Sequence, residues 1–232
     1  MSEVSEARTG ADLVADCLVA EGVTHVFGLP GTTVMDLIDA VAQNPHLRYL
    51  STRHEQVAGF MADGFSRAGD TLGVCLASRG PGAANLSIAV QNAHDESIPM
   101  LALIGQVPGS ITERRAFEEM NVVAAFRPLC KWVVEIHQVD RIPELLQRAV
   151  RTAVSGRPGP VVVSLPLDVL QAVVTAVPGP RTGSTPRPPP PRASPRRPGC
   201  SRTPSGRRSS SAAGHTTRRR CCGWPRRSVH PS

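Results

Sequence analysis

The fold is decided by residues 47–65, LRYLSTRHEQVAGFMADGF. The apolar start, Leu47–Leu50, predicts a short strand. The spacing of the apolar residues that follow predicts a helix, namely Val57, Phe60, Met61 and Phe65. The strand therefore carries Glu55 to the first turn of a helix, which in an open α/β sheet is the edge where ligands bind. The helix dipole alone also favours an acid at this position, so Glu55 by itself does not indicate a function. The loops predicted beside it supply the further evidence.

The same alternation of short strands and longer helices runs through most of the chain. Apolar runs predict strands at residues 23–27, 47–50, 72–77, 100–104, 131–136 and 161–165. The first helix begins at a capping box of Thr9 and Asp12, and a long connection at 108–126 includes one helix. We therefore predict an α/β fold, a doubly wound domain over residues 8–173, with a mostly parallel sheet of about six strands and helices on both faces.

Charge divides the chain sharply near residue 176. Residues 1–176 hold 13 basic and 19 acidic residues, a net charge of −6, whereas residues 177–232 hold 13 arginines and no acid, a net charge of +13. The second segment is rich in Arg, Pro, Ser and Gly and has few apolar residues. Such a composition cannot bury enough surface to offset chain entropy, so we predict a disordered tail over residues 177–232.

Two explanations of this tail are open. An Arg-rich segment can bind nucleic acid, but no base-reading motif accompanies these arginines, so we do not expect a nucleic-acid partner. The abrupt loss of acids favours out-of-frame translation, because a one-base slip in GC-rich DNA turns Ala, Gly, Asp and Val codons into Arg, Pro, Ser and Cys codons. A single insertion or deletion near codon 175 would then restore a long α/β reading frame. If the coding DNA contains no such frame, the tail is genuine.

Cysteine usage and hydropathy indicate where the protein works. The six cysteines have no metal-ligand spacing, and Cys17 and Cys75 fall within apolar patterns typical of a core. No apolar run reaches the roughly 18 residues that span a membrane, and the chain starts with polar and acidic residues. We therefore expect a cytoplasmic protein with reduced thiols, no membrane partner and no metal ligands of its own.

Glycine-rich segments are predicted at the same edge as Glu55. Gly28–Gly31 follows the first strand, and Ser78–Asn85 follows the third as a loop before the next helix. Glycines let a flat ligand approach the backbone closely. A dinucleotide fits poorly, because Gly80-x-Gly82-x-x-Asn85 has two of the three fingerprint glycines and the next strand ends in Gly105-Gln106 rather than an acid. The chain also lacks the Gly-Lys-Ser/Thr of a P-loop.

Taken together, these motifs resemble the N-terminal, pyrimidine-binding domain of thiamine diphosphate-dependent enzymes, above all the acetolactate synthase large subunits. The matching segments follow the family's order across about residues 8–173. They are Gly28-Leu29-Pro30-Gly31, Arg53-His54-Glu55-Gln56, Gly80-Pro81-Gly82-Ala83-Ala84-Asn85, Asp95-Glu96-Ser97-Ile98-Pro99, Gly105-Gln106-Val107-Pro108, Ala116-Phe117-Glu118-Glu119 and Gly159-Pro160-Val161-Val162-Val163. Each segment is unspecific alone, but six or more in one order are a strong signature.

The resemblance implies roles for single residues. Glu55 would be the catalytic residue, because its carboxyl group would hydrogen-bond N1′ of the aminopyrimidine and so activate thiamine diphosphate for attack on a 2-oxo acid. Gln106 and Phe117 would face the substrate. The residues expected to bind the pyrimidine half of the cofactor are Pro30, Gly31, Glu55, Pro81 and Asn85.

Two positions depart from the acetolactate synthases. Glu118 stands where those enzymes usually have Gln, and Arg79 stands where they more often have a small residue. The substrate is therefore open among 2-oxo acids such as pyruvate and the compounds used by related enzymes, which decarboxylate benzoylformate or oxalyl-CoA, or join two glyoxylates.

Enzymes of this group bind the diphosphate through Mg²⁺ in a C-terminal domain with a Gly-Asp-Gly motif, and FAD is a further possible cofactor of a full-length relative. This chain contains no Gly-Asp-Gly. We therefore expect it to hold only the pyrimidine half of a site and to be inactive alone. It would be either a truncated member of the family or a separate subunit, acting as a homodimer or beside a diphosphate-binding partner.

Overall fold

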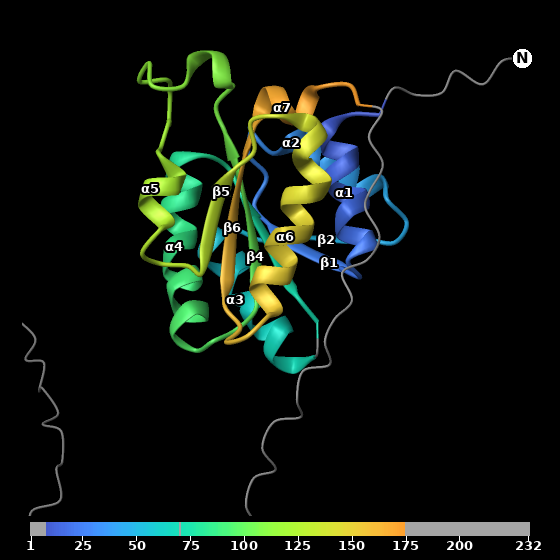
Figure 1. Cartoon of the computed structure of the whole chain (residues 1–232), viewed down its shortest axis with the longest axis vertical. Coiled ribbons are helices and arrows are strands. Elements are labelled where there is room, and N and C mark those ends of the chain that lie inside the picture. The colour runs from blue at the N-terminus through green and yellow to red at the C-terminus, as the bar shows by residue number, and fades with distance from the viewer. Residues whose placement is uncertain (1–7, 70, 175–232) are drawn as a thin grey trace, which may run out of the picture. The chain divides into compact units, whose positions relative to one another are not determined.

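The computed structural model describes residues 8–69 and 71–174 (Figure 1). The tail predicted at residues 177–232 lies outside the described residues. Among the helices that the structure does describe, not one has the length and apolar character needed to cross a bilayer.

The described chain alternates helices and strands nearly as predicted. The helices are α1 (Gly10–Ala20), α2 (Met35–Gln43), α3 (Glu55–Ala68), α4 (Gly80–Asp95), α5 (Val122–Phe126), α6 (Ile142–Val154) and α7 (Leu167–Gln171), with short 3-10 turns η1 (Gly109–Ile111) and η2 (Val139–Arg141). The strands are β1 (His25–Gly28), β2 (Arg48–Ser51), β3 (Gly73–Ala77), β4 (Met100–Gln106), β5 (Trp132–Glu135) and β6 (Pro160–Pro166). They form one sheet in the order β2-β1-β3-β4-β6-β5, and every pairing is parallel.

Helices cover both faces of the sheet, which confirms the doubly wound architecture (Figure 1). On one face, Leu13 of α1, Leu37 of α2 and Leu146 of α6 share a hydrophobic cluster with the sheet. On the other face, Leu86 of α4 and Phe126 of α5 belong to a second cluster, which also includes part of α3. Cys17 and Cys75 are buried as predicted. Burial raises the pKa of the Cys75 thiol to about 12, so this thiol is unreactive.

The N-terminus of α1 has the capping box predicted from the sequence. The backbone N–H of Thr9 donates to Asp12 Oδ2 at 2.8 Å, and the backbone N–H of Asp12 donates to Thr9 Oγ1 at 3.3 Å. Thr9 also forms an antiparallel bridge with Val173, so the first and last described residues of the domain adjoin.

Helix α3 forms where it was predicted, but it turns three of its four large apolar residues away from the sheet, and only Phe65 packs against the core. Val57, Phe60 and Met61 are between 37% and 49% exposed. The buried face of the helix consists of small or polar residues, namely Glu55, Ala58, Gly59, Ala62, Asp63 and Ser66. Small residues are needed there because α3 lies very close to α4: a Cβ atom on Gly59 would lie 2.5 Å from the Cβ of Ala89.

Helix α4 begins at Gly80, six residues earlier than the predicted loop at residues 78–85 would allow. The structure places Gly80 through Asn85 in its first turns, so the loop prediction is wrong for these residues. The reason is that Pro81 occupies the first turn, where its missing N–H costs nothing and its fixed φ suits a helix. The glycine-rich segment is therefore a rigid helix start rather than a flexible loop.

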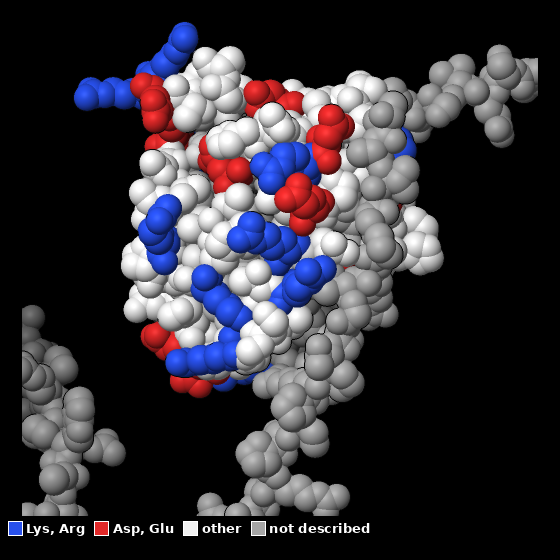
Figure 2. All heavy atoms as spheres, in the orientation of Figure 1, with Lys and Arg blue, Asp and Glu red and all other residues white. Residues whose placement is uncertain are grey.

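Figure 2 shows basic side chains gathered over the lower part of the face that carries α6. Two basic residues of the domain neutralise helix ends. Lys131 donates to the carbonyl oxygens of Thr152 and Ser155 at the end of α6, and Arg157 donates to the carbonyl oxygen of Asp95 at the end of α4. The last carbonyls of a helix lack partners within it and carry partial negative charge. Lys131 and Arg157 therefore have a structural role.

Candidate functional site

Thr52 fixes the segment that leads into α3. Its Oγ1 lies 3.2 Å from the carbonyl oxygen of Gly28 and 3.0 Å from that of His54. His54 is the N-cap of α3, and its Nδ1 accepts a hydrogen bond from the backbone N–H of Gln56. Glu55 is therefore the first helical residue, as predicted, and its side chain is turned inward, with 8% of the residue exposed.

The strand order determines which loops meet near Glu55. Strand β1 lies between β2 and β3, so the order reverses at the junction of β1 and β3. This reversal is where open α/β sheets bind ligands. The turn at Gly28–Gly31, which follows β1, therefore lies between the segment that carries Glu55 and the segment that follows β3. Glu55 follows the edge strand β2, so the other two segments both lie on the same side of it.

Glu55 nevertheless contacts the segment that follows β3, because α3 packs against α4. The side-chain amide of Asn85 donates a hydrogen bond to Glu55 Oε2 at 3.0 Å. A Cβ atom on Gly82 would lie 3.1 Å from Glu55 Oε1, so the absence of a side chain at Gly82 lets the carboxylate rest against the first turn of α4. The structure thus brings together three residues of the predicted site region.

The turn after β1 is tied to the end of β3. A Cβ atom on Gly31 would lie 2.5 Å from the Cβ of Ser78, so only glycine allows this approach. The hydroxyl oxygens of Thr33 and Ser78 are 2.9 Å apart. Pro30 and Pro81 are both exposed on these two segments. The sequence did not indicate the pair of hydroxyls, because Thr33 and Ser78 are 45 residues apart.

Gln106 and Phe117, both expected near the substrate, are placed very differently. Gln106 is 2% exposed. Its Nε2 donates to the carbonyl oxygen of Met120 at 2.7 Å, and its Oε1 accepts from the backbone N–H of Val107 at 2.9 Å. Phe117 is 76% exposed. Gln106 therefore holds the connection between β4 and α5 in place, whereas the Phe117 ring is accessible to a ligand. Their roles toward a substrate stay predictions.

The two positions that depart from the acetolactate synthase pattern form an ion pair. Arg79 Nε lies 3.2 Å from Glu118 Oε2, and the Arg79 guanidinium lies 5.4 Å from the centroid of the Phe117 ring. A Cβ atom on Gly80 would lie 2.3 Å from the carbonyl oxygen of Glu118, so backbone contact supports the pair. The two unusual charges therefore compensate each other and attach the Phe117 segment to the start of α4.

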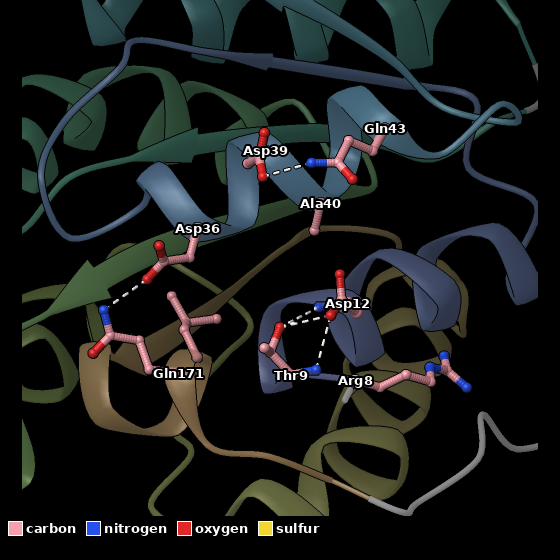
Figure 3. A pocket seen from close by; sticks show the side chains of 9 residues that line it. Arg8, Thr9, Asp12, Asp36, Asp39, Ala40, Gln43 and Gln171 are labelled. Carbon is pink, nitrogen blue, oxygen red and sulfur yellow. Dashed lines mark hydrogen bonds between the residues drawn. The ribbon is translucent and has the colours of Figure 1, made fainter. Parts of the chain in front are cut away.

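A hollow of about 720 Å³ lies elsewhere, between α1, α2 and α7 (Figure 3). Its carboxylates already have partners: Asp36 accepts from the Gln171 amide at 2.9 Å, Asp39 accepts from the Gln43 amide at 2.7 Å, and Asp12 belongs to the capping box. Within residues 8–69 and 71–174, no group of three or more His, Cys, Asp or Glu side chains could hold a metal ion. Glu55 and its neighbours therefore form the candidate site.

The site thus consists of a buried carboxylate near the reversal point of a parallel sheet, resting on a glycine of the next helix. The family model described as thiamine pyrophosphate enzyme, N-terminal TPP binding domain, matches residues 8–125. The chain therefore belongs to the thiamine pyrophosphate enzyme family.

Similarity to individual relatives agrees with this assignment. The acetolactate synthase isozyme 3 large subunit of Escherichia coli K12 is 42% identical over 165 residues, which cover 71% of this chain and 29% of that protein. The mitochondrial acetolactate synthase catalytic subunit of Aspergillus candidus is 38% identical over 167 residues, 72% of this chain and 24% of that protein. The probable acetolactate synthase large subunit of Methanococcus aeolicus is 42% identical over 160 residues, which cover 69% of this chain and 26% of that protein. The chain thus spans roughly a quarter of the length of these relatives.

Proposed function

We propose that this domain supplies the aminopyrimidine half of a thiamine diphosphate site in an acetolactate synthase-like enzyme that acts on a 2-oxo acid such as pyruvate. The observation that carries the proposal is the Glu55 carboxylate, held by Asn85 against the side-chain-free surface of Gly82. A carboxyl group in that position can share a proton with a ring nitrogen, and Gly31 and Gly82 let the segments around it approach one another closely.

Each residue of this half-site has a separate task. Glu55 would hold the aminopyrimidine through its carboxyl group, which can share a proton with a ring nitrogen. Thr52 fixes the backbone that presents Glu55, through its contacts to Gly28 and His54. When bound, thiamine diphosphate itself supplies an electron sink for the decarboxylation of the 2-oxo acid. The proposal assigns Mg²⁺ and the diphosphate to a different domain, as in the family that this chain resembles.

We infer that this diphosphate-binding domain covers the exposed apolar face of α3 and α4. The exposed large apolar residues of these two helices are Val57, Phe60 and Met61 of α3 and Ile88 of α4, which is 53% exposed. Val57 is in the same helical turn as Glu55, and Ile88 is one turn beyond Asn85. Burial of exposed apolar area beside the carboxylate would stabilise an assembly and exclude water from the site at the same time.

The diphosphate-binding domain belongs either to a homodimeric full-length enzyme or to a separate partner protein. We further propose that the complete enzyme works in the cytoplasm, with FAD as a further possible cofactor. In every case the isolated chain is expected to be inactive.

A chimera tests the proposed function. Residues 8–174 of this chain would replace the matching segment of the Escherichia coli isozyme 3 large subunit, to which they are 42% identical. We expect the chimera to form acetolactate from pyruvate with added thiamine diphosphate and Mg²⁺, because the chain would contribute a complete pyrimidine half-site. The relative with its N-terminal segment deleted serves as the control and should be inactive. A folded chimera that binds the cofactor but forms no product from pyruvate or other 2-oxo acids would refute the proposal.

A further inference from the structure

The two oxygens of the Glu55 carboxylate have different surroundings. Oε2 accepts a hydrogen bond from Asn85 Nδ2 at 3.0 Å. Oε1 lies on the side of Gly82, where a Cβ atom would be 3.1 Å away. Gly82 and Asn85 are three residues apart and therefore neighbours on one face of α4. The start of α4 thus holds the carboxylate in one orientation.

The hydrogen bond from Asn85 also determines which oxygen can carry a proton. A side-chain amide nitrogen only donates, so Oε2 must offer it a lone pair. When Glu55 is protonated, a hydrogen on Oε2 would compete with the Asn85 donor for the same atom, whereas a hydrogen on Oε1 leaves the bond intact. A hydrogen on Oε1 thus preserves the hydrogen bond from Asn85 to Oε2, and a hydrogen on Oε2 weakens it. The protonated carboxyl group therefore favours Oε1.

We propose that Asn85 is a positioning residue that directs the proton of Glu55 to Oε1, the oxygen that faces Gly82. This differs from a role of Asn85 in contacting the pyrimidine, because Asn85 acts through Glu55. The proposal rests on the proposed function in one respect: Oε1 is then the oxygen through which Glu55 shares a proton with the cofactor. The hydrogen bond itself is a property of this chain without any cofactor.

Nuclear magnetic resonance on the full-length ¹³C,¹⁵N-labelled chain tests the hydrogen bond. We expect a scalar coupling between Asn85 Nδ2 and the carboxyl carbon of Glu55, transmitted across the bond. The coupling should be lost in Asn85→Leu and partly restored in Asn85→Gln, which keeps the donor. Asn92, two turns further along α4, provides a control amide and should show no coupling to Glu55. Absence of the Asn85 coupling in the unmodified chain would overturn the proposal.

Neutron diffraction from deuterated crystals of the unmodified chain, grown at a pH at which Glu55 is protonated, locates the proton. We expect the deuteron on Oε1 and an Asn85 N–D bond directed at Oε2; a deuteron on Oε2 would overturn the proposal. These results require no variant to fold. They are also independent of the chimera, because an inactive chimera with the deuteron on Oε1 would refute the proposed function and leave the role of Asn85 intact.

Discussion

Replacing Glu55 by Gln in the chimera is expected to lower kcat by roughly two to four orders of magnitude, the range typical of a lost general acid–base group. Gln keeps the shape of Glu and can still accept from Asn85, so the helix start should survive. Gln cannot exchange a proton with the pyrimidine nitrogen, because its amide does not titrate. Steady-state measurement of acetolactate formation from pyruvate gives the effect directly.

The matched control for this variant is Glu96→Gln. Glu96 is the C-cap of α4, at the opposite end of the helix from Asn85, and its 3.7 Å ion pair with Arg67 is exposed. Exposed ion pairs contribute little, so Glu96→Gln should leave kcat nearly unchanged. If Glu55→Gln retained near-normal turnover, Glu55 would not be the proton-exchanging residue.

The second large effect is expected at the apolar face of α3 and α4. Phe60→Asp should weaken association of this chain with the remaining C-terminal part of the Escherichia coli relative by about a hundredfold, since truncating a central aromatic contact costs about 2–4 kcal/mol and a buried carboxylate costs more. Phe60 is exposed in the chain alone, so the variant should still fold. Isothermal titration calorimetry of the two polypeptides measures the change in Kd.

Ile111→Asp is the control for Phe60→Asp. Ile111 in η1 is 39% exposed and Phe60 is 37% exposed, so both substitutions add one charge at similarly exposed apolar positions. We expect Ile111→Asp to change Kd by less than about threefold, because it lies outside the α3–α4 face. Equal weakening by both variants would show that the added charge, and not the covered face, is responsible.

The sheet could be predicted because its signals are local. The strands at residues 73–77 and 100–106 are buried along their whole length and are apolar except for Gln106, and the capping box at Thr9 lies within four residues. The orientation of α3 could not be predicted in the same way. Val57, Phe60 and Met61 form an apolar stripe, but the sheet selects the opposite stripe because only small residues allow α3 to approach α4. Hydrophobicity alone does not distinguish a core from a surface that another domain covers.

The individual residues of the candidate site could be predicted from the sequence, but the contacts between them could not. The resemblance identified Glu55 and Asn85 separately, and the structure joins them across 30 residues of sequence. Nothing in the sequence relates Arg79 to Glu118, which are 39 residues apart, although each was noticed as unusual. Such pairs depend on how loops from different strands converge, and that follows from strand order rather than from spacing.

Calorimetric titration of the purified chain with thiamine diphosphate and Mg²⁺ shows whether this domain is one half of a divided cofactor site. We expect no detectable binding to the chain alone, because it holds only the pyrimidine half, and we expect binding once the C-terminal part of the relative is added. Micromolar binding by the chain alone would contradict it.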